Sequence, residues 1–444
     1  MNKDLTVGKP QRVLIMFTLP LFASVIFQQL YSIADSVIAG KYAGENALAA
    51  VGASYPITMI FMAVAFGCQI GCSVVISRYF GAKDYETTKT CISTTLIAGF
   101  VLSSLLTIAG IVLSSPLMKL VNTPENIFSD GSMYLKIYTG GFVFLFIYNV
   151  TTGIFNSLGD SKTPLLFLIF SSLGNIALDA VFVIVFEWGV AGVAWATFIA
   201  QGAACVLSVL VLLLRIRSMK TNRKPKIFSM HELGAISKVA IPSVFQQSFV
   251  SVGNMFIQGL VNSYGSSVIA GYSAAIKLNT FAITSFATFG NGISSFTAQN
   301  IGARKPERVN KGYKTETIFA LIIAAVFFVA YFFFCKPLLS LFMNEESTQL
   351  AIDTGINFMR ITAPFYFFVC IKLVSDGVLR GGECIAQFMA TTFTDLIMRV
   401  VLAFIFSGIW GADGIWYSWP GSWIAGTALS VIFYKTGKWK RNFS

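Results

Sequence analysis

Long apolar stretches alternate with short polar ones along the whole chain of 444 residues. Runs of about 20 residues or more are long enough to cross the hydrocarbon core of a bilayer as helices. They fall near 13–40, 49–77, 91–115, 131–157, 163–186, 190–214, 235–262, 267–297, 316–336, 351–379, 385–409 and 414–435. The pattern therefore predicts an all-α polytopic membrane protein with twelve transmembrane helices.

A basic, polar interruption at 215–234 divides this pattern near its midpoint. We expect an N-lobe at 1–214 (helices 1–6), a cytoplasmic linker at 215–234 and a C-lobe at 235–444 (helices 7–12). SRYFGAKDYE (77–86) matches AQNIGARKPE (298–307), and PLMKLVNTPE (116–125) matches PLLSLFMNEE (337–346), both at an offset of 221 residues. Six helices per repeat is an even number, so the lobes enter the membrane in the same direction. They are then related by a pseudo-twofold axis along the membrane normal, a plan typical of secondary transporters.

Composition and charge agree with this assignment. Only 12% of the residues are charged, against about a quarter in soluble domains. The net charge of +12 does not indicate a nucleic-acid partner, because 24 of the 32 Lys and Arg lie in loops on one side of the predicted helices. By the positive-inside rule both termini and the linker are cytoplasmic, which predicts a multi-pass protein of the plasma membrane, with the lipid bilayer as its surroundings.

The first helix carries a polar stripe. Ser24, Gln28, Tyr31 and Asp35 follow one another at steps of four, three and four residues, so they share one helix face. A carboxylate near the middle of a membrane helix costs about 3 kcal/mol or more. The retained Asp35 therefore indicates a use for its charge or its proton.

Helices five and six add a second polar group. Asn175 and Asp179 are one turn apart on helix five, and Thr197 lies on helix six. With Asp35 they offer two carboxylates, an amide and a hydroxyl, which are ligands suited to a hard cation such as Na⁺. Two nearby carboxylates also repel each other, which favours proton uptake by one of them. The alternative, that both acids only hydrogen-bond to neighbouring helices, stays open.

The chain resembles the multidrug and toxic compound extrusion (MATE) family of transporters, of the bacterial type, over nearly its whole length. The residues that carry the resemblance are Pro20, Asp35, Asn175 with Asp179, Thr197, the Gly-Ala-basic motifs at 81–83 and 302–304, and LGDSKTP (158–164). The resemblance implies a cation site at Asp35, Asn175, Asp179 and Thr197, and a helix bend at Pro20. It also implies a substrate cavity, to which we assign Gln28, Tyr31, Asn149, Gln247, Asn254 and Asp376.

The second half departs from the first. Asn254 lies opposite Asp35 in the repeat, so helix seven offers no acid. Some family members use an acidic pair from helices seven and ten in this lobe, and here only Asp376 of helix ten is present. Lys372 precedes Asp376 by one turn, and Asp395 precedes Arg399 by one turn, so each pair can neutralise itself. Structural pairing and substrate contact both remain open for them.

The resulting prediction is an antiporter that exports amphipathic, often cationic organic compounds by alternating access, driven by H⁺ or Na⁺. It predicts a monomer with no cofactor and no enzymatic activity. The chain has no Walker loop, GxSxG or dinucleotide fingerprint, which argues against ATP-driven pumping within this chain. The nearest rival is a flippase for lipids or lipid-linked oligosaccharides of the same superfamily, which would need a more cationic cavity. A membrane-embedded transferase would need clustered acids at a membrane face, and a passive channel fits poorly with two unequal lobes.

Overall fold

The structure is a computed structural model of the chain. It describes the backbone of residues 4–38, 45–121, 123–221, 223–343 and 348–443, and their side chains apart from those of 33–38, 45–49 and 441–443. Its helices are α1 (Pro10–Ile38), α2 (Glu45–Gly81), α3 (Tyr85–Leu120), α4 (Glu125–Gly140), α5 (Phe142–Ser157), α6 (Lys162–Asp179), η2 (Ala180–Val185), α7 (Gly189–Arg217), α8 (Met230–Asn262), α9 (Ser266–Gly302), α10 (Pro306–Phe333), α11 (Cys335–Leu339), α12 (Gln349–Thr362), η3 (Ala363–Phe365), α13 (Tyr366–Gly381), α14 (Ile385–Trp410), α15 (Ala412–Lys435) and η4 (Lys438–Phe443).

Within the described residues, each of the twelve predicted apolar runs lies almost entirely in one of these helices or in two or three consecutive ones. Among the described residues, eight helices or joined helices are long and apolar enough to cross a membrane, and nine if α4 and α5, which meet at a bend of 45°, form one span. Three further long helices, α8, α9 and α15, are more polar and fall outside this set. The all-helical, multi-span class predicted from the sequence is confirmed.

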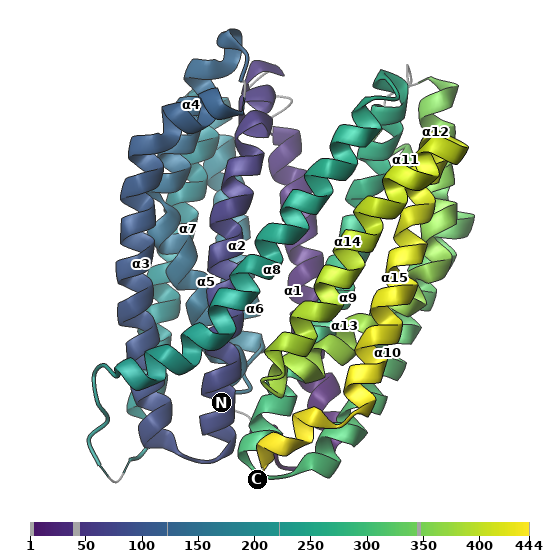
Figure 1. The fold of residues 1–444 in the computed structure, drawn as a ribbon. Coiled ribbons are helices and arrows are strands. Elements are labelled where there is room, and N and C mark those ends of the chain that lie inside the picture. The colour runs from purple at the N-terminus through teal and green to yellow at the C-terminus, as the bar shows by residue number, and fades with distance from the viewer. Residues whose placement is uncertain (1–3, 39–44, 122, 222, 344–347, 444) are drawn as a thin grey trace. The chain divides into compact units, whose positions relative to one another are not determined.

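The described contacts divide the chain into two compact units. Unit 1 comprises Leu19–Ser248 with the first few residues of the chain, and unit 2 comprises Leu5–Thr18 and Phe249–Ser444. In each unit the helices run alongside one another as a bundle (Figure 1). The start of α1 thus belongs to unit 2, and the start of α8, with the basic linker before it, belongs to unit 1. The lobe boundaries expected from the sequence repeat stay a prediction.

The repeat is visible in four turns that connect helices. In the turn after α2, Ala82, Lys83 and Asp84 donate backbone hydrogen bonds to the carbonyls of Arg78, Phe80 and Tyr79, and Lys83 adopts a left-handed φ of 61°. The turn after α9 repeats this bonding pattern at a distance of 221 residues, with Arg304 at a φ of 56°. The turns after α5 and α13 have the same pattern, with Gly159 at 73° and Glu383 at 56°. Each half of the chain therefore uses the same left-handed turn twice.

Small residues allow close helix packing inside unit 2. A Cβ added to Gly377 of α13 would overlap the carbonyl oxygen of Gly290 of α9, so the two backbones are in direct contact there. Such glycine contacts are a common way for helices to associate where no water drives them together.

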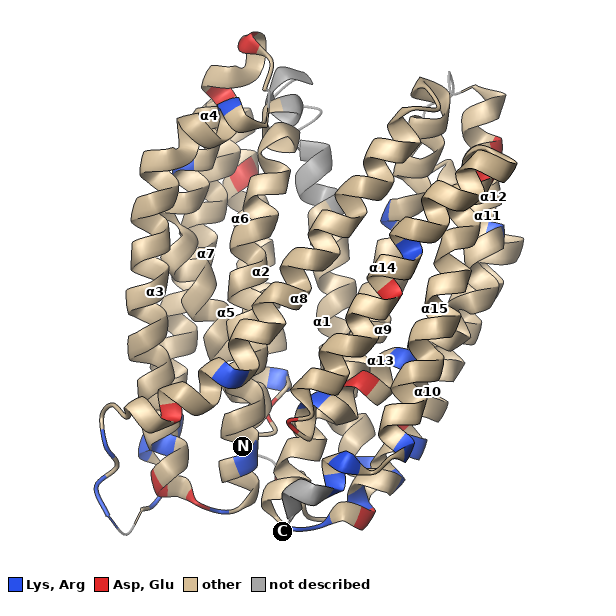
Figure 2. Ribbon diagram, viewed as in Figure 1, with Lys and Arg blue, Asp and Glu red and all other residues tan. Residues whose placement is uncertain are grey.

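Charged residues gather near the helix ends within each unit, and few lie along the helix middles (Figure 2). This distribution is expected for helices that cross a membrane, because a charge in the hydrocarbon core is costly. The charged groups that do lie inside the bundles are therefore candidates for function.

Candidate functional site

Two predicted site residues of α6 are buried inside unit 1. Asn175 is 2% exposed and Asp179, one turn later, is fully buried. The Asn175 side chain donates from Nδ2 to Oγ1 of Thr197 on α7 at 3.5 Å. The amide oxygen of Asn175 accepts no hydrogen bond from a described residue. The structure thus brings together Asn175 and Thr197 and keeps an amide oxygen available to a further donor or to a cation, and the predicted coupling role of these residues stays a prediction.

The backbone changes pitch directly after Asp179. The segment η2 is a π-helix, in which the Phe186 amide reaches back to the carbonyl of Val181 at 2.9 Å. Gly192 of α7 lies so close to Phe182 of this segment that an added Cβ would be about 3.1 Å from its carbonyl carbon. Such π-helical segments occur frequently at functional sites, where they set the direction of a nearby side chain. Here the π-helical segment begins at the residue directly after Asp179.

The polar stripe of α1 is described in part. Pro20 is buried inside the helix, and Ser24 Oγ donates to the Pro20 carbonyl at 2.9 Å. Gln28 is exposed and Tyr31 is partly buried. The side chain of Asp35 lies outside the described residues, so its predicted place beside Asp179 stays a prediction.

Three other predicted cavity residues lie on α5 and α8. Asn149 of α5 is partly buried and donates to the Leu145 carbonyl at 2.8 Å. Gln247 is partly buried in unit 1, and Asn254 is exposed in unit 2. Their role in a shared cavity stays a prediction.

Asp376 is held in a buried network inside unit 2. Its Oδ2 bonds Lys372 Nζ at 2.9 Å, and its Oδ1 accepts from Thr391 at 2.8 Å and from Ser430 at 2.7 Å. The residue itself is 3% exposed. The neutralising Lys372–Asp376 pair expected from the sequence is confirmed, and it is embedded in further hydrogen bonds.

The second expected pair, Asp395 with Arg399, is also confirmed, at 2.9 Å. Two contacts were not predicted. Lys372 lies 3.7 Å from Asp395, which joins the pairs of α13 and α14, and the Arg399 guanidinium lies 4.2 Å from the ring centre of Trp419. The positive and negative charges of this network neutralise one another and are hydrogen-bonded. These are the features of a group that stabilises the packing of unit 2.

Sequence reasoning missed an acid that is fully buried within a helix. Glu316 of α10 is fully buried in unit 2, and neither of its carboxylate oxygens makes a hydrogen bond to a described residue. The available signal was a lone acid within an apolar run, but it lies at the edge of the predicted span 316–336, where exposure to water is the usual expectation.

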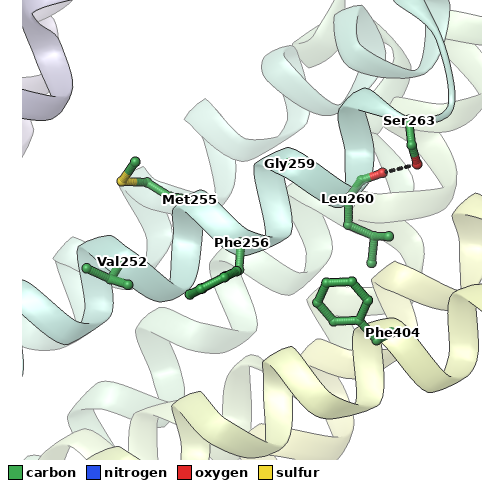
Figure 3. A pocket seen from close by; sticks show the side chains of 7 residues that line it. All are labelled: Val252, Met255, Phe256, Gly259, Leu260, Ser263 and Phe404. Carbon is green, nitrogen blue, oxygen red and sulfur yellow. Dashed lines mark hydrogen bonds between the residues drawn. The ribbon is translucent and has the colours of Figure 1, made fainter. Parts of the chain in front are cut away.

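The described residues contain no group of three or more His, Cys, Asp or Glu side chains that could hold a metal ion. A cavity of about 540 Å³ lies in unit 2 between α8 and α14, lined by Val252, Met255, Phe256, Gly259, Leu260, Ser263 and Phe404 (Figure 3). The Ser263 hydroxyl donates to the Leu260 carbonyl at 2.7 Å, so the cavity wall is essentially apolar. None of the predicted site residues lines it.

Comparison with known proteins identifies related sequences and folds. A family model described as MatE matches residues 20–181 and 242–405. The probable multidrug resistance protein YpnP of Bacillus subtilis (strain 168) is 28% identical over 439 residues, which cover 98% of this chain and 97% of that protein.

Two solved structures share the fold at 22% identity. One, described as the outward-facing conformation of a multidrug resistance MATE family transporter, has a TM-score of 0.92 and covers 98% of both chains. Another, described as MATE in the bent conformation, has a TM-score of 0.88 and covers 97% of this chain and 96% of that one. The helical arrangement found here is therefore a known one.

Proposed function

Because the chain belongs to the multidrug and toxic compound extrusion (MATE) family, we propose that it is an antiporter that exports amphipathic, often cationic organic compounds in exchange for H⁺ or Na⁺. The observation that carries this proposal is the buried polar group of α6 and α7, in which Asn175 bonds Thr197 one turn from the fully buried Asp179. A carboxylate kept inside a membrane helix marks an ion or proton pathway more often than a packing site.

The coupling step follows from the chemistry of this group. Asp179 supplies a carboxylate, Asn175 an amide oxygen and Thr197 a hydroxyl, and Asp35 is the fourth proposed member. Uptake of H⁺ or Na⁺ changes the charge that the helices must enclose, and so changes which arrangement of the unit is most stable. The ion gradient then drives the return of the transporter after substrate release.

Pro20 is the proposed hinge of this change. Proline removes one backbone hydrogen bond of the helix, which lowers the cost of a bend. The division of α1 between the two units falls between Thr18 and Leu19, next to this proline. A related protein has been described in a bent conformation, which supports bending as part of the transport cycle.

The proposed orientation places both termini and the linker 215–234 in the cytoplasm of a plasma membrane. Its support is the loop distribution of Lys and Arg, which is biased towards one side of the predicted helices. Export of a cation is then movement from the linker side to the opposite side.

The test is efflux of a fluorescent organic cation from proteoliposomes with a pH gradient or a Na⁺ gradient imposed separately. We expect Asp179→Asn and Asp35→Asn to lower gradient-driven efflux by about tenfold or more, since amides cannot carry the proton or the charge. Asp84→Asn is the matched control, because Asp84 is an exposed helix cap of unit 1 and asparagine also caps helices. Full gradient-driven efflux in both site variants would contradict the proposal.

A further inference from the structure

Glu316 is a buried acid that the proposed coupling site does not use. It lies in the part of α10 that is apolar enough to span a membrane, Pro306–Phe333, and its side chain is fully buried. Neither carboxylate oxygen makes a hydrogen bond to a described residue. An ionised carboxylate in such a place would lose its hydration without compensation, so the neutral acid is the favoured form.

The neighbour of Glu316 is the start of α1. The hydroxyl of the fully buried Thr18 lies near the carboxyl group, and it also makes no hydrogen bond to a described residue. A Cβ added to Gly292 of α9 would lie 2.6 Å from Thr18 Oγ1 and 3.4 Å from Glu316 Oε1. The glycine therefore leaves the space in which the acid and the hydroxyl face each other.

Charged groups on the elements around α10 are engaged elsewhere or exposed. On α13, Lys372 and Asp376 bond each other, and Arg380 donates to Asn291 at 2.7 Å. On α9, Lys277 lies over the ring of Phe342. The remaining titratable or charged side chains described on these elements are Arg12 and Tyr31 of α1, Tyr272 of α9, Cys335 and Lys336 of α11, Asp353 and Arg360 of α12, Tyr366 and Cys370 of α13, and Glu307, Arg308, Lys311, Tyr313, Lys314 and Tyr331 of α10 itself.

None of these groups forms an ion pair with Glu316. Among the described residues the acid thus has a hydroxyl neighbour and no counter-ion. One carboxyl and one hydroxyl are too few oxygen ligands for a metal cation, which takes several. A proton needs only one carboxylate oxygen.

We propose that Glu316 is a proton-binding site of unit 2, in which the protonated acid donates its O–H to Thr18 Oγ1 and so ties α10 to the first segment of α1. Loss of the proton leaves a buried carboxylate, which is stable only when water or a donor reaches it. Deprotonation is therefore coupled to movement of Leu5–Thr18 away from α10. This inference deepens the proposed function, because it assumes an ion-coupled cycle and adds an H⁺ site outside the group of α6 and α7.

The direct test is infrared spectroscopy of the full chain in lipid nanodiscs, since a protonated carboxylic acid has a carbonyl band that a carboxylate lacks. We expect the difference spectrum of wild type and Glu316→Gln at neutral pH to contain such a band. Thr18→Val should shift this band, because the acid then loses its acceptor. Glu307→Gln, an exposed glutamate on the same helix, is the matched control and should leave it unchanged.

A second measurement connects the site with transport. Glu316→Gln, which resembles the protonated acid permanently, is expected to lower H⁺-driven efflux about tenfold while binding of the fluorescent cation is retained. Absence of the carbonyl band at every pH would overturn the inference, even if efflux is coupled to H⁺. Absence of gradient-driven efflux in the wild type, with the band present, would instead contradict the proposed function alone.

Discussion

Asp376 receives three donors at once, the ammonium of Lys372 and the hydroxyls of Thr391 and Ser430. A buried charge pair of this kind contributes little net stability, because both charges have left water. Removing one partner is different, since it leaves the other charge buried without compensation. At the scale of single residues, loss of one partner should therefore destabilise the buried network of α13 and α14 more than loss of an exposed charge at a helix end.

The network yields a prediction about stability. Lys372→Met should lower the free energy of unfolding by about 3 to 5 kcal/mol, because Asp376 keeps its hydroxyl donors but loses the cation that neutralises it. The measurement is the unfolding transition in detergent. Lys314→Met, at an exposed position of α10, is the control and should change stability by less than about 0.5 kcal/mol. Equal stability of the two variants would show that the hydroxyls suffice.

At the scale of elements, the four left-handed turns carry the internal repeat. A left-handed conformation costs a residue with a Cβ about 1 to 2 kcal/mol, whereas glycine adopts it without this cost. Gly159 already meets the requirement, and Lys83 and Arg304 do not.

Lys83→Gly is therefore expected to raise the free energy of unfolding by about 1 kcal/mol, because it removes the left-handed strain at an exposed position. The matched control is Lys89→Gly in the interior of α3, which should lower stability by about 1 kcal/mol, because glycine is a poor helix former. In thermal unfolding, we expect Lys83→Gly to be more stable than the wild type and Lys89→Gly to be less stable. A loss of stability in both variants would contradict the assigned strain.

A second element is the segment before α1, which is hydrogen-bonded to the end of α9 and the start of α10. The Leu5 amide donates to Gln299 Oε1 at 2.9 Å, and Leu5 itself is fully buried. Arg308 donates to the carbonyls of Gly8 at 2.6 Å and of Leu5 at 3.0 Å. Residues on both sides of the Gly-Ala-basic motif of the second half thus hold the segment before α1 in place.

Arg308→Ala should release this segment. Each lost hydrogen bond contributes about 1 kcal/mol, and those from a charged donor contribute more, so protection against hydrogen exchange at residues 5–8 should fall by about tenfold or more. The measurement is hydrogen–deuterium exchange by mass spectrometry. Arg304→Ala, which changes an exposed arginine in the turn before α10, is the control and should leave the exchange of these residues unchanged.

The helices and their contacts show which features of the structure could be predicted from the sequence and which could not. Apolar runs predicted every long helix, because length and hydropathy are local properties. Asn175 and Thr197 were found because polar side chains are rare in such runs, and helical spacing indicated their face. The contact of Lys372 with Asp395 was not predictable, since it depends on how α13 and α14 pack. Glu316 was missed for a related reason: its position near a predicted helix end does not reveal that Thr18 and Gly292 enclose it.

At the scale of the whole molecule, the charges predict an orientation that can be measured. The loop bias of Lys and Arg predicts that the linker 215–234 is cytoplasmic and that the loop after α3 lies outside. Lys220 and Lys119 are exposed lysines at these two places. A membrane-impermeant maleimide should therefore label Lys119→Cys in intact cells and Lys220→Cys only after permeabilisation. The native cysteines are buried or partly buried, so the unmodified chain gives the background. The reverse labelling pattern would invert the membrane orientation, and with it the direction in which an antiporter of this design exports its substrate.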